Sequence, residues 1–377
     1  MRNRTTMLIS SLIMLALLTG CQTNRPSPML KELASQLERP SFGEEFQVAG
    51  KRDSLLQFIT GQLTGPYGIY TNWQDTDQKA EVATGHEALS ESAGLLMRYY
   101  AQMGQKDKFE QQWQLAKATF DMKTGFSYRY SPKLQKKFTL NASVDDLRIM
   151  RALEEAAIVF HEPSYRKEAE SLGKRFYSNL VVDGRLTDFY DESYHMNNSF
   201  ITLCYIDLAT LDLISTSNKK SAELLSNMVH IAKNGYLSDS FPFYQTRYDY
   251  KTNSYQTEQI QTVESLLTIL NLAEVKQHSD ASIRYIKEHI QSDTLFARYA
   301  IDGTPLNDVR STAIYAIAAM IGSVIQDKEL YNASIQRMNA FQVQDAQSPL
   351  LGGFGDVPSG QAYSFDNLMA LLAYVYR

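Results

Sequence analysis

The sequence predicts an all-α protein made of six helical hairpins, and three observations support this. Hydrophobic residues recur with helical periodicity almost everywhere after residue 50, whereas continuous strand-like alternation is scarce. Twelve helical segments can be counted along the chain. Short and long connections alternate between these segments, as expected for antiparallel helix pairs. Six such hairpins are what an (α/α)6 barrel needs, and we predict that fold for residues 47–377.

The twelve helices are expected, in order, at 51–63, 87–103, 106–119, 143–160, 164–179, 194–215, 219–233, 257–275, 280–291, 307–324, 327–341 and 363–376. The long connections are rich in Gly, Tyr, Phe, Asp and Asn and return at every second junction. They should therefore gather at one end of the hairpins, where loops carry function. An open α-solenoid is the alternative, but no sequence period recurs at the spacing of the pairs.

The N-terminus predicts export and lipid anchoring. Arg2 and Arg4 precede an apolar run over 8–18, and Leu18-Thr19-Gly20 leads to Cys21. This pattern is typical of a bacterial lipoprotein signal over residues 1–20, after which Cys21 is lipidated. The apolar run is shorter than the about 20 residues that span a bilayer. Acyl chains on Cys21 would hold the mature protein at the outer face of the cell membrane. Residues 21–46 are expected to form a tether with a short helix near 30–37.

Composition excludes several classes of function. The chain has 377 residues, 44% of them hydrophobic, as in a folded globular protein. A formal net charge of −5 gives no electrostatic footprint for nucleic acid. The six histidines show no metal-ligand spacing, and neither a metal site nor a cofactor is expected. Cys204, the only other cysteine, lies in an apolar run and is expected in the core.

Residues 84–97 carry the clearest chemical signal. Thr84 and Glu87 have the spacing of a capping box, which would begin a helix. Glu91 follows one turn later at the edge of the apolar face, so its carboxyl is expected to face a cleft. The like charge of Glu87 favours the protonated form that a general acid needs, whereas the helix dipole favours the ionised form. A solvated helix glutamate is the alternative.

Two segments resemble glycoside hydrolase family 8. Ser90-Glu91-Ser92-Ala93-Gly94-Leu95-Leu96-Met97 is similar to the Ser-Glu-Gly-Gln-Gly-Tyr-Gly-Met region of that family. Residues 142–153 resemble its Ala-Thr-Asp-Ala-Asp-x-x-Ile-Ala-x-Ala-Leu signature, and residues 363–368 resemble its last helix. The resemblance implies an (α/α)6 barrel of inverting β-glycosidases with Glu91 as the general acid. In character it is closest to the lipoprotein members that accompany exopolysaccharide synthesis, which implies a synthase complex as a partner.

The second signature departs from the family at Val144, where the family has a substrate-contacting aspartate. The neighbouring Asp145 could serve instead, and Asp146 matches a family aspartate. The alternative for both acids is structural, because first-turn carboxylates complement the helix dipole and Arg148 can pair with Asp145 at i,i+3.

An inverting hydrolase also needs a carboxylate base about 6.5–9.5 Å from the acid. The resemblance places this base just before the eighth helix in a Tyr-Asp-x-x-Arg context. Tyr248-Asp249 is the nearest match, although no arginine follows at the family spacing. Asp249 is therefore the predicted base, with Glu258 and Asp308 as rivals.

Aromatic residues in the long loops could form a sugar-stacking wall, although packing is the alternative for each. The candidates are Tyr67, Trp73, Tyr128 and Tyr194.

Together, these features predict a membrane-anchored, extracytoplasmic glycoside hydrolase that cleaves a β-1,4-linked polysaccharide by inversion. Its expected partners are the polysaccharide, the lipid bilayer through Cys21 and a polysaccharide synthase complex. One alternative is a catalytically decayed barrel that only binds glycan. Another is a different (α/α)6 enzyme, such as an unsaturated-glycuronyl hydrolase or a polysaccharide lyase.

Overall fold

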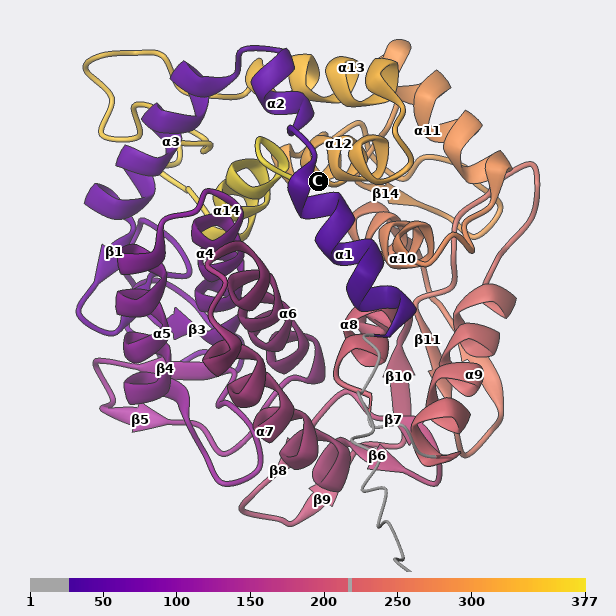
Figure 1. Ribbon diagram of the computed structural model, residues 1–377. Helices are drawn as coiled ribbons and strands as arrows, with labels where there is room; N and C mark the ends of the chain where they lie inside the picture. Colours follow the sequence, from indigo (N-terminus) through magenta and orange to yellow (C-terminus); the bar gives the residue numbers. More distant parts are fainter. Residues whose placement is uncertain (1–26, 216–218) are drawn as a thin grey trace, which may run out of the picture.

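The computed structural model describes residues 27–215 and 219–377. Six inner helices form a closed ring, each packed against the next and the last against the first (Figure 1). The ring consists of α4 (Ser90–Gln102), α6 (Ser143–Val159), α8 (Leu208–Leu213), α10 (Thr262–Glu274), α12 (Thr312–Val324) and α14 (Ser364–Ala373). These helices are apolar on most faces because neighbours surround them. In α12, for example, every residue from Thr312 to Ser323 is buried.

Six outer helices surround the ring and bury mainly one face each. They are α3 (Ala49–Gln62), α5 (Lys106–Phe120), α7 (Pro163–Leu180), α9 (Lys219–Asn234), α11 (Asp280–Gln291) and α13 (Lys328–Asn339). Short connections join the first five inner helices to the outer helix that follows each in sequence, and long loops join each outer helix to the following inner one. The predicted (α/α)6 fold is confirmed.

Several inner helices begin later than the sequence predicts. The expected starts at 87, 257 and 307 lie three to five residues before the observed starts at Ser90, Thr262 and Thr312. In two cases a short strand precedes the helix and pairs with the next long loop, β3 (Ala88–Leu89) with β4 (Arg129–Ser131), and β13 (Ile260–Gln261) with β14 (Arg298–Tyr299). This pairing depends on distant residues, so local periodicity does not show it.

The largest difference concerns the helix expected at 194–215. The first part of that segment instead contains β9 (Met196–Asn197), β10 (Phe200–Thr202) and a 3₁₀ turn, η1 (Leu203–Tyr205), and only the short α8 follows as an α-helix. β10 pairs with β11 (Arg247–Asp249), which also pairs with β12 (Ser254–Gln256). The remaining two-residue strands are β1 (Thr64–Gly65), β2 (Gly68–Ile69), β5 (Lys136–Lys137), β6 (Val181–Val182), β7 (Arg185–Leu186) and β8 (Tyr190–Asp191).

Two N-terminal helices, α1 (Pro28–Glu38) and α2 (Phe42–Glu45), pack onto the barrel. α1 lies across the end of the ring at which the inner helices finish and contacts α6 and α8 (Figure 1). Leu33, Leu37 and Phe42 are buried, so most of the segment interpreted as a tether is folded onto the domain. The signal and Cys21 lie outside the described residues. No helix among the described residues is long and apolar enough to cross a membrane.

A buried ionic network fills the same end of the ring, below α1. Arg98 on α4 binds both carboxylate oxygens of Glu155 on α6, with a shortest distance of 2.7 Å. Arg151 joins Glu155 to Glu274 on α10, and the Tyr376 hydroxyl donates to Glu274 at 2.7 Å. These contacts link three inner helices and the C-terminus through side chains that are almost fully buried.

Candidate functional site

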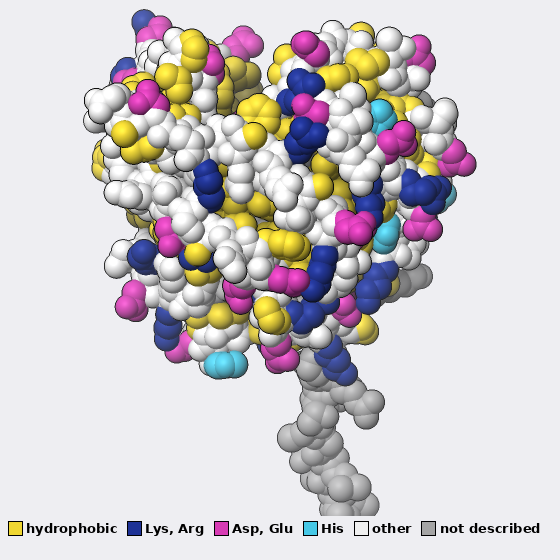
Figure 2. All heavy atoms as spheres, turned by 90° about the horizontal axis from the view of Figure 1, so that it is seen from above, with side chains coloured by type: hydrophobic (Ala, Val, Ile, Leu, Met, Phe, Trp, Pro, Cys, Tyr) yellow, Lys and Arg dark blue, Asp and Glu magenta, His cyan; other side chains and the backbone are white. Residues whose placement is uncertain are grey.

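Carboxylates gather at the opposite end of the ring, where the inner helices begin. Four of the six inner helices carry an acid in the first turn: Glu91 on α4, Asp145 and Asp146 on α6, Glu264 on α10 and Asp366 on α14. Negative charge is favoured at a helix N-terminus, so the ring tolerates this concentration of acids. Figure 2 views the toroid from its side and shows a notch between two lobes at the edge away from α1.

Glu91 lies in a three-residue ionic cluster. Arg148 on α6 donates through Nη1 to Glu91 Oε2 at 2.9 Å and to Asp145 Oδ1 at 3.1 Å. Ser90 Oγ donates to the other oxygen of Asp145 at 3.1 Å. α4 and α6 approach closely here, since a Cβ on Gly94 would lie 3.0 Å from the Cβ of Arg148. The Glu91 side chain is 23% exposed, so solvent or a ligand can reach it.

Asp145 is the most perturbed member of this cluster. Burial and then the negative charge of Glu91 raise the pKa of Asp145 to about 7, against the opposing effect of Arg148. Burial alone would lower the pKa of Arg148, but the charges of Glu91 and Asp145 raise it. The cluster therefore holds an exchangeable proton near neutral pH, the range in which a general acid is effective.

Asp188 and Glu264 form a second acidic pair, which sequence reasoning missed. Asp188 is buried, accepts from the backbone N–H and the hydroxyl of Thr202 at 2.7 and 2.6 Å, and has its pKa raised to about 6 by burial. Burial and then the charge of Asp188 raise the pKa of Glu264. Glu264 Oε2 is buried and has no hydrogen-bond partner within the described residues.

Tyr205 is close enough to both acidic pairs for their charges to affect its hydroxyl. Burial raises its pKa, and the charges of Cys204, Asp145, Asp188 and Glu91 add to the effect. Tyr205 thus lies within electrostatic range of both pairs. η1, which carries Tyr205, packs against α10. Cys204 is buried, as expected for a core residue.

Asp249 occupies a different environment. It ends β11 at the turn of the β11–β12 hairpin, and its Oδ1 accepts from the backbone N–H groups of Lys251 and Thr252 at 2.8 and 2.9 Å. These bonds lower the pKa of Asp249. The hydrogen-bond partners of the Asp249 carboxylate thus belong to its own hairpin turn and not to the first turns of the inner helices. Its rivals Glu258 and Asp308 are exposed.

Comparison with known proteins places this geometry in a family. The chain is 32% identical to a structure described as a novel alpha-amylase from Clostridium perfringens, with a TM-score of 0.80 over 86% of this chain and 97% of that one. A cold-adapted family 8 xylanase in complex with substrate superimposes with a TM-score of 0.64 at 11% identity, covering 91% of this chain and 92% of that chain. The chain belongs to the glycoside hydrolase family 8 type of (α/α)6 toroid.

A relative found by sequence also matches over most of the chain. "Putative lipoprotein YdaJ" of Bacillus subtilis (strain 168) is 27% identical over 319 residues, which cover 81% of this chain and 84% of that protein. No protein-family model matches the chain.

The second signature segment departs from family 8 at Val144. Val144 is buried and, with Arg148, lines a cavity of about 40 Å³ inside the ring. Asp145, one residue later, shares Arg148 with Glu91. Within the described residues, no group of three or more His, Cys, Asp or Glu side chains could hold a metal ion.

Asp146 binds the long loop that precedes α6. Its oxygens accept from the Phe126 backbone N–H at 2.9 Å and from Asn141 Nδ2 at 2.7 Å. Burial raises its pKa to about 7. A Cβ on Gly125 would lie 2.4 Å from Asp146 Oδ2. Since both oxygens bind the long loop before α6, the structure gives Asp146 a loop-holding role.

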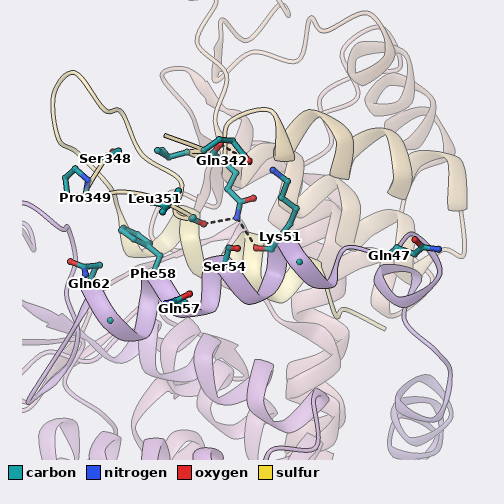
Figure 3. A pocket seen from close by; sticks show the side chains of 15 residues that line it. Gln47, Lys51, Ser54, Gln57, Phe58, Gln62, Gln342, Ser348, Pro349 and Leu351 are labelled. Carbon is teal, nitrogen blue, oxygen red and sulfur yellow. Dashed lines mark hydrogen bonds between the residues drawn. The ribbon is translucent and has the colours of Figure 1, made fainter. Parts of the chain in front are cut away.

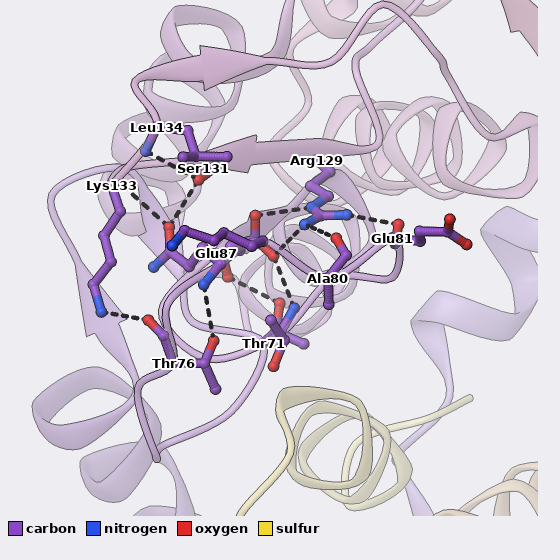
Figure 4. Close-up of polar contacts among 12 residues, drawn as sticks. Thr71, Thr76, Ala80, Glu81, Glu87, Arg129, Ser131, Lys133 and Leu134 are labelled. Atoms are coloured by element: carbon purple, nitrogen blue, oxygen red, sulfur yellow. Dashed lines mark hydrogen bonds and ion pairs between the residues drawn. The ribbon is translucent and has the colours of Figure 1, made fainter.

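The capping pattern at Thr84 does not begin a helix. Its reciprocal bond exists, from the Thr84 backbone N–H to Glu87 Oε2 at 2.9 Å, but β3 follows and α4 begins at Ser90. Glu87 is fully buried and pairs with Arg129, Nη2 to Oε2 at 2.8 Å (Figure 4). Arg129 also donates to the carbonyls of Ala80 and Glu81. The expectation that Glu87 shares a helix with Glu91 is therefore wrong; Glu87 and Arg129 hold the loop that leads into α4.

The four candidate aromatic residues lie in three long loops, with Tyr67 and Trp73 in the same one. Tyr67 is 38% exposed and contacts Tyr130 at a ring distance of 4.6 Å. Trp73 and Tyr128 are half-buried, whereas Tyr194 is 75% exposed between β8 and β9. Tyr67 and Tyr194 are therefore the ones that present the most surface to a ligand.

Asp145 gives the family 8 site a testable pH dependence. Because its pKa is raised from 3.8 to about 7, the folded state binds this proton more tightly than the unfolded state. Its contribution lowers stability progressively as pH rises from about 4 to about 7, and the penalty is constant above that range. The stability of Asp145→Asn should therefore exceed that of wild type by an amount that grows between pH 5 and pH 8, from about 1 to about 4 kcal/mol. Urea unfolding at several pH values measures this difference, and a difference independent of pH would contradict the protonation of Asp145.

Proposed function

We propose that this protein hydrolyses a polysaccharide with inversion and that Glu91 is the general acid. The observation that carries the proposal is the position of Glu91, in the first turn of an inner helix and partly exposed at the loop end of the ring. The Asp145 pKa of about 7 supplies a proton within the same cluster. Glu91 would protonate the leaving oxygen, and Asp145 would return a proton between turnovers.

The base must be sought elsewhere than at Asp145. Oxygens of Glu91 and Asp145 contact the same Nη1 atom at 2.9 and 3.1 Å, so these two oxygens are at most about 6 Å apart. An inverting pair needs about 6.5–9.5 Å to admit the attacking water.

We propose Glu264 as the base in preference to Asp249. Glu264 lies in the first turn of an inner helix, as Glu91 does, and Glu264 Oε2 has no partner within the described residues. One carboxylate oxygen of Asp249 already accepts two hydrogen bonds from its own hairpin turn. The raised pKa of Glu264 also makes it a stronger base than an ordinary glutamate.

The linkage has two candidates. The family 8 resemblance favours a β-1,4-linked polymer. An α-linked glucan is the second candidate, because the 32% identical structure is described as an alpha-amylase.

Release of reducing ends from soluble β-1,4-glucan, β-1,4-xylan and amylose tests both the activity and the linkage. Proton NMR of the first product should show the anomer opposite to the cleaved bond. Binding of these polymers without any release would instead support a decayed, glycan-binding barrel.

We further propose that acylated Cys21 anchors the protein at the outer face of the membrane. A relative described as a lipoprotein supports this. Since α1 begins at Pro28, residues 21–27 could span at most about 25 Å. α1 covers the end of the ring opposite Glu91, so the active end would face away from the bilayer, toward polymer leaving the cell or its synthase complex. Cell fractionation of a Cys21→Ala variant tests this, and unchanged membrane association would contradict it.

A further inference from the structure

A groove of about 760 Å³ runs along the outer helix α3, and Glu91 is not among the residues that line it (Figure 3). One side is α3 and the segment just before it, and the other is the loop over 342–352. Five glutamines line it, three from the α3 side and two from the loop: Gln47, Gln57, Gln62, Gln342 and Gln344. Nothing in the proposed hydrolytic mechanism uses this groove.

The chemistry of the lining selects a neutral, hydroxyl-rich ligand. Gln47, Gln57 and Gln62 are exposed and make no side-chain hydrogen bond within the described part of the chain. Each amide can donate and accept, which matches a sugar hydroxyl. Lys51 is the only ionisable residue of the lining. Leu351, 47% exposed, adds an apolar surface suited to the C–H face of a sugar ring.

Gln342 supplies an independent sign of a ligand. It is 4% exposed, and its Nε2 donates to the carbonyl of Lys51 on the α3 side at 2.9 Å and to the carbonyl of Gly352 in its own loop at 2.7 Å. Its Oε1 has no hydrogen-bond partner within the described residues. A buried acceptor without a donor is unfavourable, and a hydroxyl entering the groove beside it would supply one.

Two glycines in α3 have no packing reason to be glycines. A Cβ on Gly50 or on Gly61 would meet no atom within 4 Å. Glycine is disfavoured in a helix relative to residues with a side chain. Both glycines line the groove, and their absent side chains keep it open.

We propose that this groove is a second carbohydrate-binding site, which takes an uncharged polysaccharide. It holds the polymer on the outer wall while the loop end of the ring acts on it. The site is separate from Glu91, so its binding does not depend on turnover.

Affinity electrophoresis tests the proposal with three soluble polymers: hydroxyethylcellulose, amylose and the acidic carboxymethylcellulose. All variants are made in the Glu91→Gln chain to prevent hydrolysis. Gly50→Leu combined with Gly61→Leu should weaken binding of an uncharged polymer at least fivefold, with an unchanged or raised Tm. The matched control, Thr60→Leu, lies on α3 outside the groove and should bind normally.

A second variant keeps the test independent of the glycines. Gln57→Ala combined with Gln344→Ala removes two exposed amides and should also weaken binding at least fivefold. Normal binding by both double variants would overturn the proposal, and so would a preference for carboxymethylcellulose. Failure of the wild-type chain to hydrolyse any polymer would overturn the proposed enzyme without affecting this result.

Discussion

Glu91→Gln should lower the rate of glycan hydrolysis by about 10²–10⁴-fold, the usual contribution of a general acid. The amide keeps the size of the side chain and can still accept from Arg148, so the fold should be preserved. Reducing-end release, measured with the polymer that the wild-type enzyme prefers, gives the loss. Circular dichroism and Tm confirm that the variant is folded.

The matched comparison is between two further carboxylates. Glu264→Gln should cause a loss of similar size, because it removes the proposed base, and added azide should restore product formation at that position. Asp249→Asn should change activity much less, since the asparagine oxygen can still accept from the hairpin turn. Full activity of Glu91→Gln would refute the acid assignment, and a dead Asp249→Asn beside an active Glu264→Gln would reverse the choice of base.

Glu155→Gln should destabilise the protein by about 3–5 kcal/mol, because it leaves the buried guanidinium group of Arg98 without its paired carboxylate. Glu155 is 1% exposed and contacts both Arg98 and Arg151. Urea unfolding followed by circular dichroism measures the change. Activity should survive at low temperature, since this network lies at the end of the ring opposite Glu91.

The chain provides a matched control for this effect. Glu162 pairs with Lys106 at 2.6 Å, but these side chains are 42% and 50% exposed. Glu162→Gln should therefore cost at most about 1 kcal/mol. Equal losses for the two variants would show that burial of the network does not govern its contribution.

Local periodicity predicted the helices well but their beginnings poorly. The predicted bounds of α5 and α13 lie within a few residues of the observed ones, because their apolar faces, and in α13 the Asp327 cap, are local features. Inner helices such as α10 were extended backwards through strands that pair with loops far along the chain. That error had a functional consequence. A helix that begins at 257 puts Glu264 two turns inside it. The observed start at Thr262 puts Glu264 in the first turn, the position that Glu91 has in α4.

The all-α architecture, the six hairpins and the place of Glu91 near the start of an inner helix can all be predicted from the sequence alone. Hydrophobic spacing and connection length carry that information, because they set which faces are buried and which helices are neighbours. Only the tertiary structure decided the partners of each carboxylate. Glu87 pairs with Arg129, Glu91 pairs with Arg148, and Asp249 accepts hydrogen bonds from its own hairpin turn. A charged side chain binds whichever donor the folded chain brings within about 3 Å, and for Glu87 and Glu91 that donor lies roughly 40 to 60 residues away in the sequence.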